Sequence, residues 1–204
     1  MRGIPETLPV LAVSDRRLCR GSLTAQLRRL VSLRDDGTLA AEGIDLAGLI
    51  LREKDLDPLA WRELAAQVQE ICAAAGLPLY PAGHPQTVRQ LACPRLHLPL
   101  PQLAALRARG FDPGTFTDCS VSCHSLAGVR RAERLGATRI ILGTIFATDC
   151  KPGLAGRGPD FLRDVCAATK LPVFAIGGIE PARLPLLRRT GAAGGCMMSW
   201  MMRR

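Results

Sequence analysis

Short apolar runs alternate with helical segments along the whole chain. Eight runs are too short for helices, end in polar residues or glycine, and therefore predict buried strands. They cover residues 8–13, 46–52, 77–80, 96–98, 119–123, 140–146, 172–176 and 196–199. The clearest helix starts after Asp57 and Pro58, carries an apolar residue every three or four positions, and ends at Gly76.

Strands that alternate with helices through short links predict a (β/α)8 TIM barrel, and no dinucleotide-binding fingerprint supports an open doubly wound sheet instead. We expect one domain over residues 1–204, with its last helix short or missing. In such barrels the site lies at the carboxyl ends of the strands, and phosphate often binds the loops after the seventh and eighth strands. These loops contain Gly177, Gly178 and Ser199 here.

The chain ends at Arg204, directly after the eighth predicted strand. Several large apolar residues then have no following segment to cover them, namely Met197, Met198, Trp200, Met201 and Met202. This apolar end predicts a subunit contact, and hence a homo-oligomer, or a shortened barrel wall.

Composition and charge narrow the class of protein. A hydrophobic content of 48% with 22% charged residues is typical of a soluble globular domain. The net charge of +9 is scattered, comes mostly from arginine, and is accompanied by only 4% aromatic residues, which argues against a nucleic-acid partner. No apolar run is long enough for a membrane span and the start lacks the apolar core of a signal peptide, so we expect a cytoplasmic protein.

The eight cysteines do not indicate a metal centre, because they form no C-x-x-C pair and have no regular spacing. Cys119, Cys123 and His124 are the nearest approach to a ligand set. Along a strand the two cysteines share one face while the histidine points to the other, so the three cannot chelate one ion. We expect no metal ligands.

The sixth predicted strand runs into a polar, glycine-rich loop, and the sequence over residues 139–158 is RIILGTIFATDCKPGLAGRG. Thr148, Asp149 and Lys151 are followed by three glycines around Arg157. Backbone amides and two cations can converge there on a phosphate or a carboxylate. A tight turn with solvated charges is the alternative for a loop of this composition.

Five strand ends together resemble the thiamine phosphate synthase and TenI thiazole tautomerase superfamily. They are LREK (51–54), VSCHS (121–125), GTIFATDCKPGLAGRG (143–158), AIGGI (175–179) and MMS (197–199). These segments follow the order of the family over essentially the whole chain. The loop after the sixth strand is similar to the TenI motif T-D-C-K-x-G-L-x-G-R-G, which residues 148–158 match.

The resemblance implies roles for individual residues. Gly177, Gly178 and Ser199 match the positions that bind the thiazole phosphate in the family. Synthases place further residues around the pyrimidine diphosphate, and the matching positions are Arg52, Lys54, Ser122, Thr148 and Lys151. In a tautomerase the same positive groups would face the carboxylate or phosphate of the thiazole.

The chain departs from both branches of the superfamily. Synthases resemble one another in an Asn-Asp pair after the third strand and a His-Leu-Gly-Gln segment with a nearby acid after the fourth, which hold Mg²⁺, but residues 80–83 and 97–100 contain no carboxylate here. TenI proteins carry a catalytic histidine where this chain has Thr144, and threonine cannot act as a base near neutral pH. His124 and His97 are the remaining candidates for proton transfer. We expect His124 to transfer the proton while Lys151 holds the substrate anion.

Three functions follow from these matches and departures. The main hypothesis is a TenI-like isomerase, a thiazole tautomerase that acts on a thiazole phosphate carboxylate without a metal or another cofactor. The second is thiamine phosphate synthase, a transferase that joins pyrimidine diphosphate to thiazole phosphate with Mg²⁺. The third is a non-catalytic regulator or carrier that binds a thiazole or pyrimidine phosphate.

Overall fold

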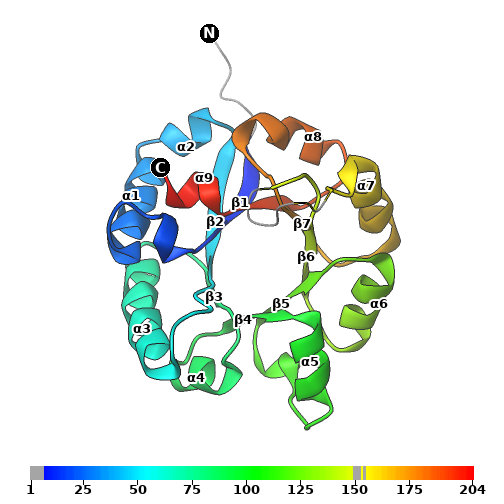
Figure 1. Cartoon of the computed structure of the whole chain (residues 1–204), viewed down its shortest axis with the longest axis horizontal. Coiled ribbons are helices and arrows are strands. Elements are labelled where there is room, and N and C mark those ends of the chain that lie inside the picture. The colour runs from blue at the N-terminus through cyan, green and yellow to red at the C-terminus, as the bar shows by residue number, and fades with distance from the viewer. Residues whose placement is uncertain (1–6, 149–152, 154) are drawn as a thin grey trace.

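The computed structural model describes residues 7–148, 153 and 155–204. Eight parallel strands form one sheet with helices around it, so the predicted TIM-barrel fold is confirmed (Figure 1). The strands are β1 Leu8–Val13, β2 Ile44–Leu51, β3 Leu79–Pro81, β4 Arg95–Pro99, β5 Asp118–Cys123, β6 Arg139–Gly143, β7 Val173–Ile176 and β8 Gly194–Met197.

The sheet closes into a ring between β3 and β4. Its strand order is β3-β2-β1-β8-β7-β6-β5-β4, so these two strands are its ends. An isolated parallel bridge joins Ala82 to His97, and the amide of Gly83 donates to the carbonyl of His97 at 2.9 Å. Because all strands run in one direction, their carboxyl ends meet at one end of the barrel, which we call the mouth.

Helices surround the strands, and three of those described begin at side-chain caps. They are α1 Leu23–Asp35, α2 Thr38–Ala41, α3 Pro58–Ala74, α4 Pro85–Gln90, α5 Leu100–Arg107, α6 Leu126–Arg134, α7 Gly158–Ala168, α8 Leu184–Arg188 and α9 Ser199–Met202, with short 3-10 turns η1 Arg16–Leu18, η2 Pro113–Thr115 and η3 Pro181–Arg183. The side chains of Ser22, Asp57 and Ser125 accept hydrogen bonds from the first-turn amides of α1, α3 and α6. Within the described residues, no helix combines the length and the apolar character that a membrane crossing requires.

The apolar core has two parts, because successive strand residues point alternately into the barrel and toward the helices. The larger part lies between strands and helices and includes Trp61, which is 1% exposed. The smaller part fills the inside of the barrel and includes Leu11, Ile50, Ile141 and Phe174. On β5 the alternation is plain: its two cysteines and its valine join the outer core, and its serines face inward.

The chain beyond β8 corrects the expected apolar end. A short helix, α9, follows β8, contacts β1 and η1, and lies inside the circle of outer helices in Figure 1. Met197, Met201 and Met202 are at most 1% exposed, and the side chain of Gln26 donates to the main-chain carbonyl of Met201 at 2.6 Å. Arg204 pairs with Glu42 on the other side of this helix. Met197, Met201 and Met202 are therefore core residues and provide no argument for a subunit contact, while Met198 and Trp200 are partly buried.

We predict that α9 contributes to stability through its buried methionines. Met201→Ala should lower the free energy of unfolding by about 2–4 kcal/mol, because it removes a fully buried side chain and leaves a cavity. Urea unfolding at neutral pH measures this loss. Arg203→Ala, at an exposed position of the same segment, should change the free energy by about 0.5 kcal/mol or less. Equal effects of the two changes would contradict the buried position of α9.

Candidate functional site

Most of the predicted site residues that the structure describes come together at the mouth. Arg52 and Lys54 follow β2, Ser122 and His124 lie at the end of β5, Thr144 and Thr148 follow β6, Gly177 and Gly178 follow β7, and Ser199 follows β8. Lys151 and Asp149 lie outside the described residues. The strands bring these groups together because each precedes a loop at the same end of the ring.

His97 connects two serines just below the mouth. Its Nδ1 lies 2.8 Å from Ser120 Oγ and its Nε2 lies 2.9 Å from Ser122 Oγ, while Ser120 Oγ is also 3.4 Å from the carbonyl oxygen of Leu96. The arrangement that satisfies every group has the Ser120 hydroxyl donating to Leu96 and accepting from Nδ1–H. His97 Nε2 then accepts from the Ser122 hydroxyl, so the histidine orients the serine that the resemblance places against the substrate.

The position of His97 keeps its imidazole neutral. The residue is 5% exposed, and burial lowers its pKa to about 4, with the nearby positive charge of Arg52 adding to the effect. A base that holds its proton so weakly, with both ring nitrogens already bonded to serines, is poorly suited to move a proton on a substrate at neutral pH. Of the two candidate histidines, His97 is therefore a positioning residue.

His124 is held differently, at the exposed edge of the mouth. Its Nδ1 lies 2.6 Å from the carbonyl oxygen of Gly143, which can only accept, so Nδ1 carries the proton and Nε2 is the accepting nitrogen of the ring. The guanidinium of Arg157 donates to the main-chain carbonyl of His124 and lies over the ring of Phe161, 3.7 Å from its centre. The imidazole is thus fixed beside the residue that precedes Thr144, where TenI proteins carry their histidine.

The long loop after β6 is closed at its base by hydrogen bonds between its two ends. The amide of Arg157 donates to Thr144 at 3.0 Å, and the amide of Gly158 donates to Ile145 at 2.9 Å. Gly156 lies so close to the main chain of Ile145 that a Cβ would overlap it. These contacts explain the Gly-Arg-Gly sequence. Gly158 has a positive φ of 82°, and Gly156 has no room for a Cβ beside the main chain of Ile145.

The glycines after β7 lie in close packing contact with the loop after β6. A Cβ on Gly177 would lie 2.5 Å from Thr144 Cγ2, and a Cβ on Gly178 would lie 2.6 Å from the carbonyl oxygen of Ala147. Both residues also have a positive φ, 102° and 62°. The missing side chains thus make room for the β6 loop, and a phosphate role for these residues depends on their backbone amides alone.

The carboxylates of the mouth are engaged by arginines of the loop after β1. Glu53 is buried and accepts from the amide and the guanidinium of Arg16, which also forms a bidentate pair with Asp55 at 2.7 and 2.9 Å. Arg17 lowers the pKa of Asp15 through a hydrogen bond at 2.9 Å. The sequence alone did not identify Glu53 as the partner of Arg16. Its burial follows from strand alternation, which sends Arg52 and Lys54 to one side and Glu53 to the other.

These residues do not fit a magnesium site at the ends of β3 and β4. The side chains there belong to Pro81, Ala82, Pro99 and Leu100, which offer no oxygen ligand, and Mg²⁺ needs carboxylates. Among the described residues, no group of three or more histidine, cysteine or acidic side chains could hold a metal ion.

Comparisons with known proteins agree with the fold and identify the family. The sequence profile of the TMP-TENI family, described as thiamine monophosphate synthase, matches residues 10–201. The chain belongs to this family. A solved structure titled thiamine phosphate pyrophosphorylase, from Pyrococcus furiosus, superposes with a TM-score of 0.77 over 97% of this chain and 88% of that one, at 20% identity, and has the same fold.

Curated relatives carry synthase names. The bifunctional ThiM/ThiE protein of Symbiobacterium thermophilum is 35% identical over 72% of this chain, which spans only 31% of that longer protein. A thiamine-phosphate synthase of Desulfitobacterium hafniense is 30% identical over 74% of this chain and 73% of its own length. Another, from Coprothermobacter proteolyticus, is 25% identical over 96% and 88%.

We predict that His97 makes the protein less stable in acid. An unfolded histidine has a pKa of about 6.5, whereas the buried one has a pKa of about 4, so the unfolded chain binds more protons between these values. The free energy of unfolding should fall by about 1.4 kcal/mol per pH unit from this residue as the pH drops from 6.5 toward 4. Urea unfolding of wild type and His97→Gln at several pH values measures the difference in slope.

The exposed His84 provides the matched control for this prediction. His84→Asn should keep the slope of the wild type, whereas His97→Gln should flatten it. Identical slopes for wild type and His97→Gln would mean that His97 is not held neutral in the folded protein.

Proposed function

We propose that this protein is an enzyme of thiamine biosynthesis that binds a thiazole phosphate at the mouth of the barrel and catalyses a proton shift on it, as a thiazole tautomerase. The observation that carries the proposal is the hydrogen bond of 2.6 Å between His124 Nδ1 and the Gly143 carbonyl. This contact supports the proposal because it holds an imidazole next to Gly143, the residue before Thr144, and Thr144 follows β6 where TenI proteins carry their histidine.

In the proposed binding mode, the substrate contacts loops after several different strands of the ring. The phosphate would meet the backbone amides of Gly178 and Ser199 after β7 and β8, where TIM barrels commonly hold phosphate. Arg52 supplies positive charge directly after β2, and this charge adds to the burial that lowers the pKa of His97. The Ser122 hydroxyl, oriented by His97, would then contact the thiazole between the two charged ends.

The catalytic half needs one group that takes a proton from the substrate and returns it at another position. His124 suits this task, because Nδ1 stays protonated against a carbonyl while Nε2 can accept a proton. Arg157 positions the histidine by binding its main-chain carbonyl and by closing the β6 loop beside it. No metal ion takes part in this proposal, because aromatisation of a thiazole has no diphosphate leaving group to stabilise.

Condensation to thiamine phosphate is the second candidate function. The names of the relatives favour condensation over isomerisation. Two proteins that are 30% and 25% identical to this chain over most of their length are called thiamine-phosphate synthases. The side chains at the ends of β3 and β4 argue in the other direction, because they offer no ligand for the magnesium that stabilises a departing diphosphate. The two reactions are separated by their products and by their need for metal.

We predict that the protein converts the non-aromatic tautomer of thiazole phosphate carboxylate to the aromatic one, at the same rate with and without a chelator. The measurement follows the aromatic product by ultraviolet absorbance. A parallel incubation with pyrimidine diphosphate, thiazole phosphate and Mg²⁺ should give no thiamine phosphate. Chelator-sensitive formation of thiamine phosphate would establish the synthase instead, and binding of the thiazole with neither product would establish a non-catalytic binder.

We further predict that His124→Gln lowers kcat for the tautomerisation by about 10²- to 10⁴-fold with little change in KM, because it removes proton transfer and leaves the anion contacts intact. His84→Asn removes an imidazole from the loop before α4 and serves as the matched control, with wild-type kinetics expected. A His124→Gln variant as fast as wild type would exclude His124 from the mechanism.

A further inference from the structure

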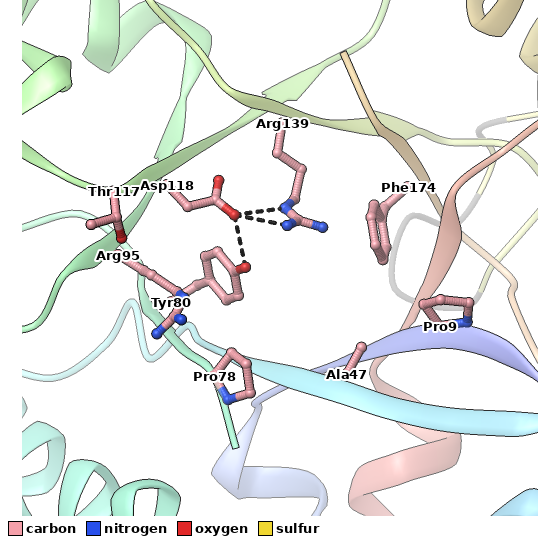
Figure 2. Close-up of a pocket in the computed structure, with 9 residues that line it drawn as sticks. All are labelled: Pro9, Ala47, Pro78, Tyr80, Arg95, Thr117, Asp118, Arg139 and Phe174. Carbon is pink, nitrogen blue, oxygen red and sulfur yellow. Dashed lines mark hydrogen bonds and ion pairs between the residues drawn. The ribbon is translucent and has the colours of Figure 1, made fainter. Parts of the chain in front are cut away.

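The end of the barrel opposite the mouth carries a cavity of about 570 Å³ (Figure 2). Its walls include Arg95, Asp118 and Arg139, which are the first residues of β4, β5 and β6. Their position at the amino ends of the strands separates this cavity from the mouth by the apolar residues that fill the barrel, such as Ile50 and Ile141. The cavity is therefore a second and independent space in the molecule.

The carboxylate in this cavity, Asp118, already accepts hydrogen bonds from three neighbouring side chains. Asp118 accepts from the Tyr80 hydroxyl at 2.9 Å, from the Thr138 hydroxyl at 2.7 Å, and from the guanidinium of Arg139 at 2.8 and 3.1 Å. Arg139 lowers the pKa of Asp118, whereas burial alone would raise it, so the group is ionised near neutral pH. Its single negative charge balances Arg139 and no further cation.

Arg95 adds a second positive charge to the same wall. Its guanidinium lies over the Tyr80 ring, 6.0 Å from the ring centre, and in the described part of the chain no carboxylate lies within 4.0 Å of it. Burial raises the pKa of Tyr80 to about 12, so the ring stays neutral and cannot balance Arg95. The wall thus keeps an excess of one positive charge among Arg95, Arg139 and Asp118.

Apart from Thr117 and the hydroxyl of Tyr80, the remaining walls of the cavity are apolar. Figure 2 shows the Arg139 guanidinium between the rings of Tyr80 and Phe174, with Pro9, Ala47 and Pro78 across the cavity from Arg139. Aromatic and proline side chains suit a flat hydrocarbon body, and a half-buried guanidinium suits a carboxylate, with which it can form two parallel hydrogen bonds.

We propose that this cavity is a binding site for a small organic anion, a flat aromatic body with one carboxylate that Arg95 would bind. The excess charge requires an anion, the apolar walls require a hydrophobic body, and the volume limits the ligand to a small molecule. The site lies at the opposite end of the barrel from the proposed thiazole site and does not depend on the reaction there.

The sequence contains one tyrosine, Tyr80, which offers a direct reporter on the site. Protein labelled with 3-fluorotyrosine should give one ¹⁹F resonance, and titration with benzoate should shift it with a Kd in the millimolar range typical of so small a ligand. Benzyl alcohol, which has the ring without the charge, should shift it much less. Inorganic phosphate, which has charge without the ring, should also have little effect.

Two variants separate the contributions of charge and space. Arg95→Gln should weaken benzoate binding about tenfold or more, whereas Arg163→Gln, which removes an equal charge from the exposed face of α7, should leave it unchanged. Ala47→Leu should also reduce binding, because the larger side chain fills the cavity. Circular dichroism and urea unfolding check that each variant is folded. The proposal fails if benzoate does not move the resonance, if benzyl alcohol binds equally well, or if Arg95→Gln binds as tightly as wild type.

Discussion

Closure of the sheet between β3 and β4 is the constraint on which the rest of this structure depends. The bridge from Ala82 to His97 and the bond from Gly83 to the same residue join the two ends of the sheet. Once the ring is closed, every parallel strand presents one end to the mouth, and alternate side chains must fill the interior or meet the helices. Charged loops from distant parts of the sequence then surround one space.

The interior of the ring is partly polar, and its polar groups form hydrogen-bonded networks. His97 lies between two serines near the mouth, and Asp118 lies between Tyr80, Thr138 and Arg139 at the other end. Unpaired polar groups in such a place would each destabilise the fold by about 1–3 kcal/mol. Among the described residues, no buried side-chain nitrogen or oxygen lacks a hydrogen-bond partner. Each network therefore supports the fold and fixes side chains that a ligand can meet.

Family membership and local chemistry carry different information about this protein. The family profile covers nearly the whole barrel, over residues 10–201. The side chains that would distinguish condensation from isomerisation lie at a few positions after β3, β4 and β6, and there the chain differs from both patterns. The reaction depends on the side chains at those positions, because one barrel fold supports several reactions. In the proposed function, His124, which bonds to the carbonyl of Gly143, takes the role that Thr144 cannot perform.

The sequence by itself determined the order of strands and helices, and hence the barrel and the end at which the site lies, because these follow from local periodicity and from parallel strand direction. It favoured His124 over His97 for proton transfer, but it did not show the difference in burial between the two histidines. The register of β4 against β5 sets His97 opposite Ser120 and buries it, while the end of β6 leaves His124 exposed. It also misjudged the methionines after β8, which are buried by contact with β1, almost two hundred residues away in the chain. Burial and pairing depend on which distant segments come together, and only the closed tertiary structure decides that.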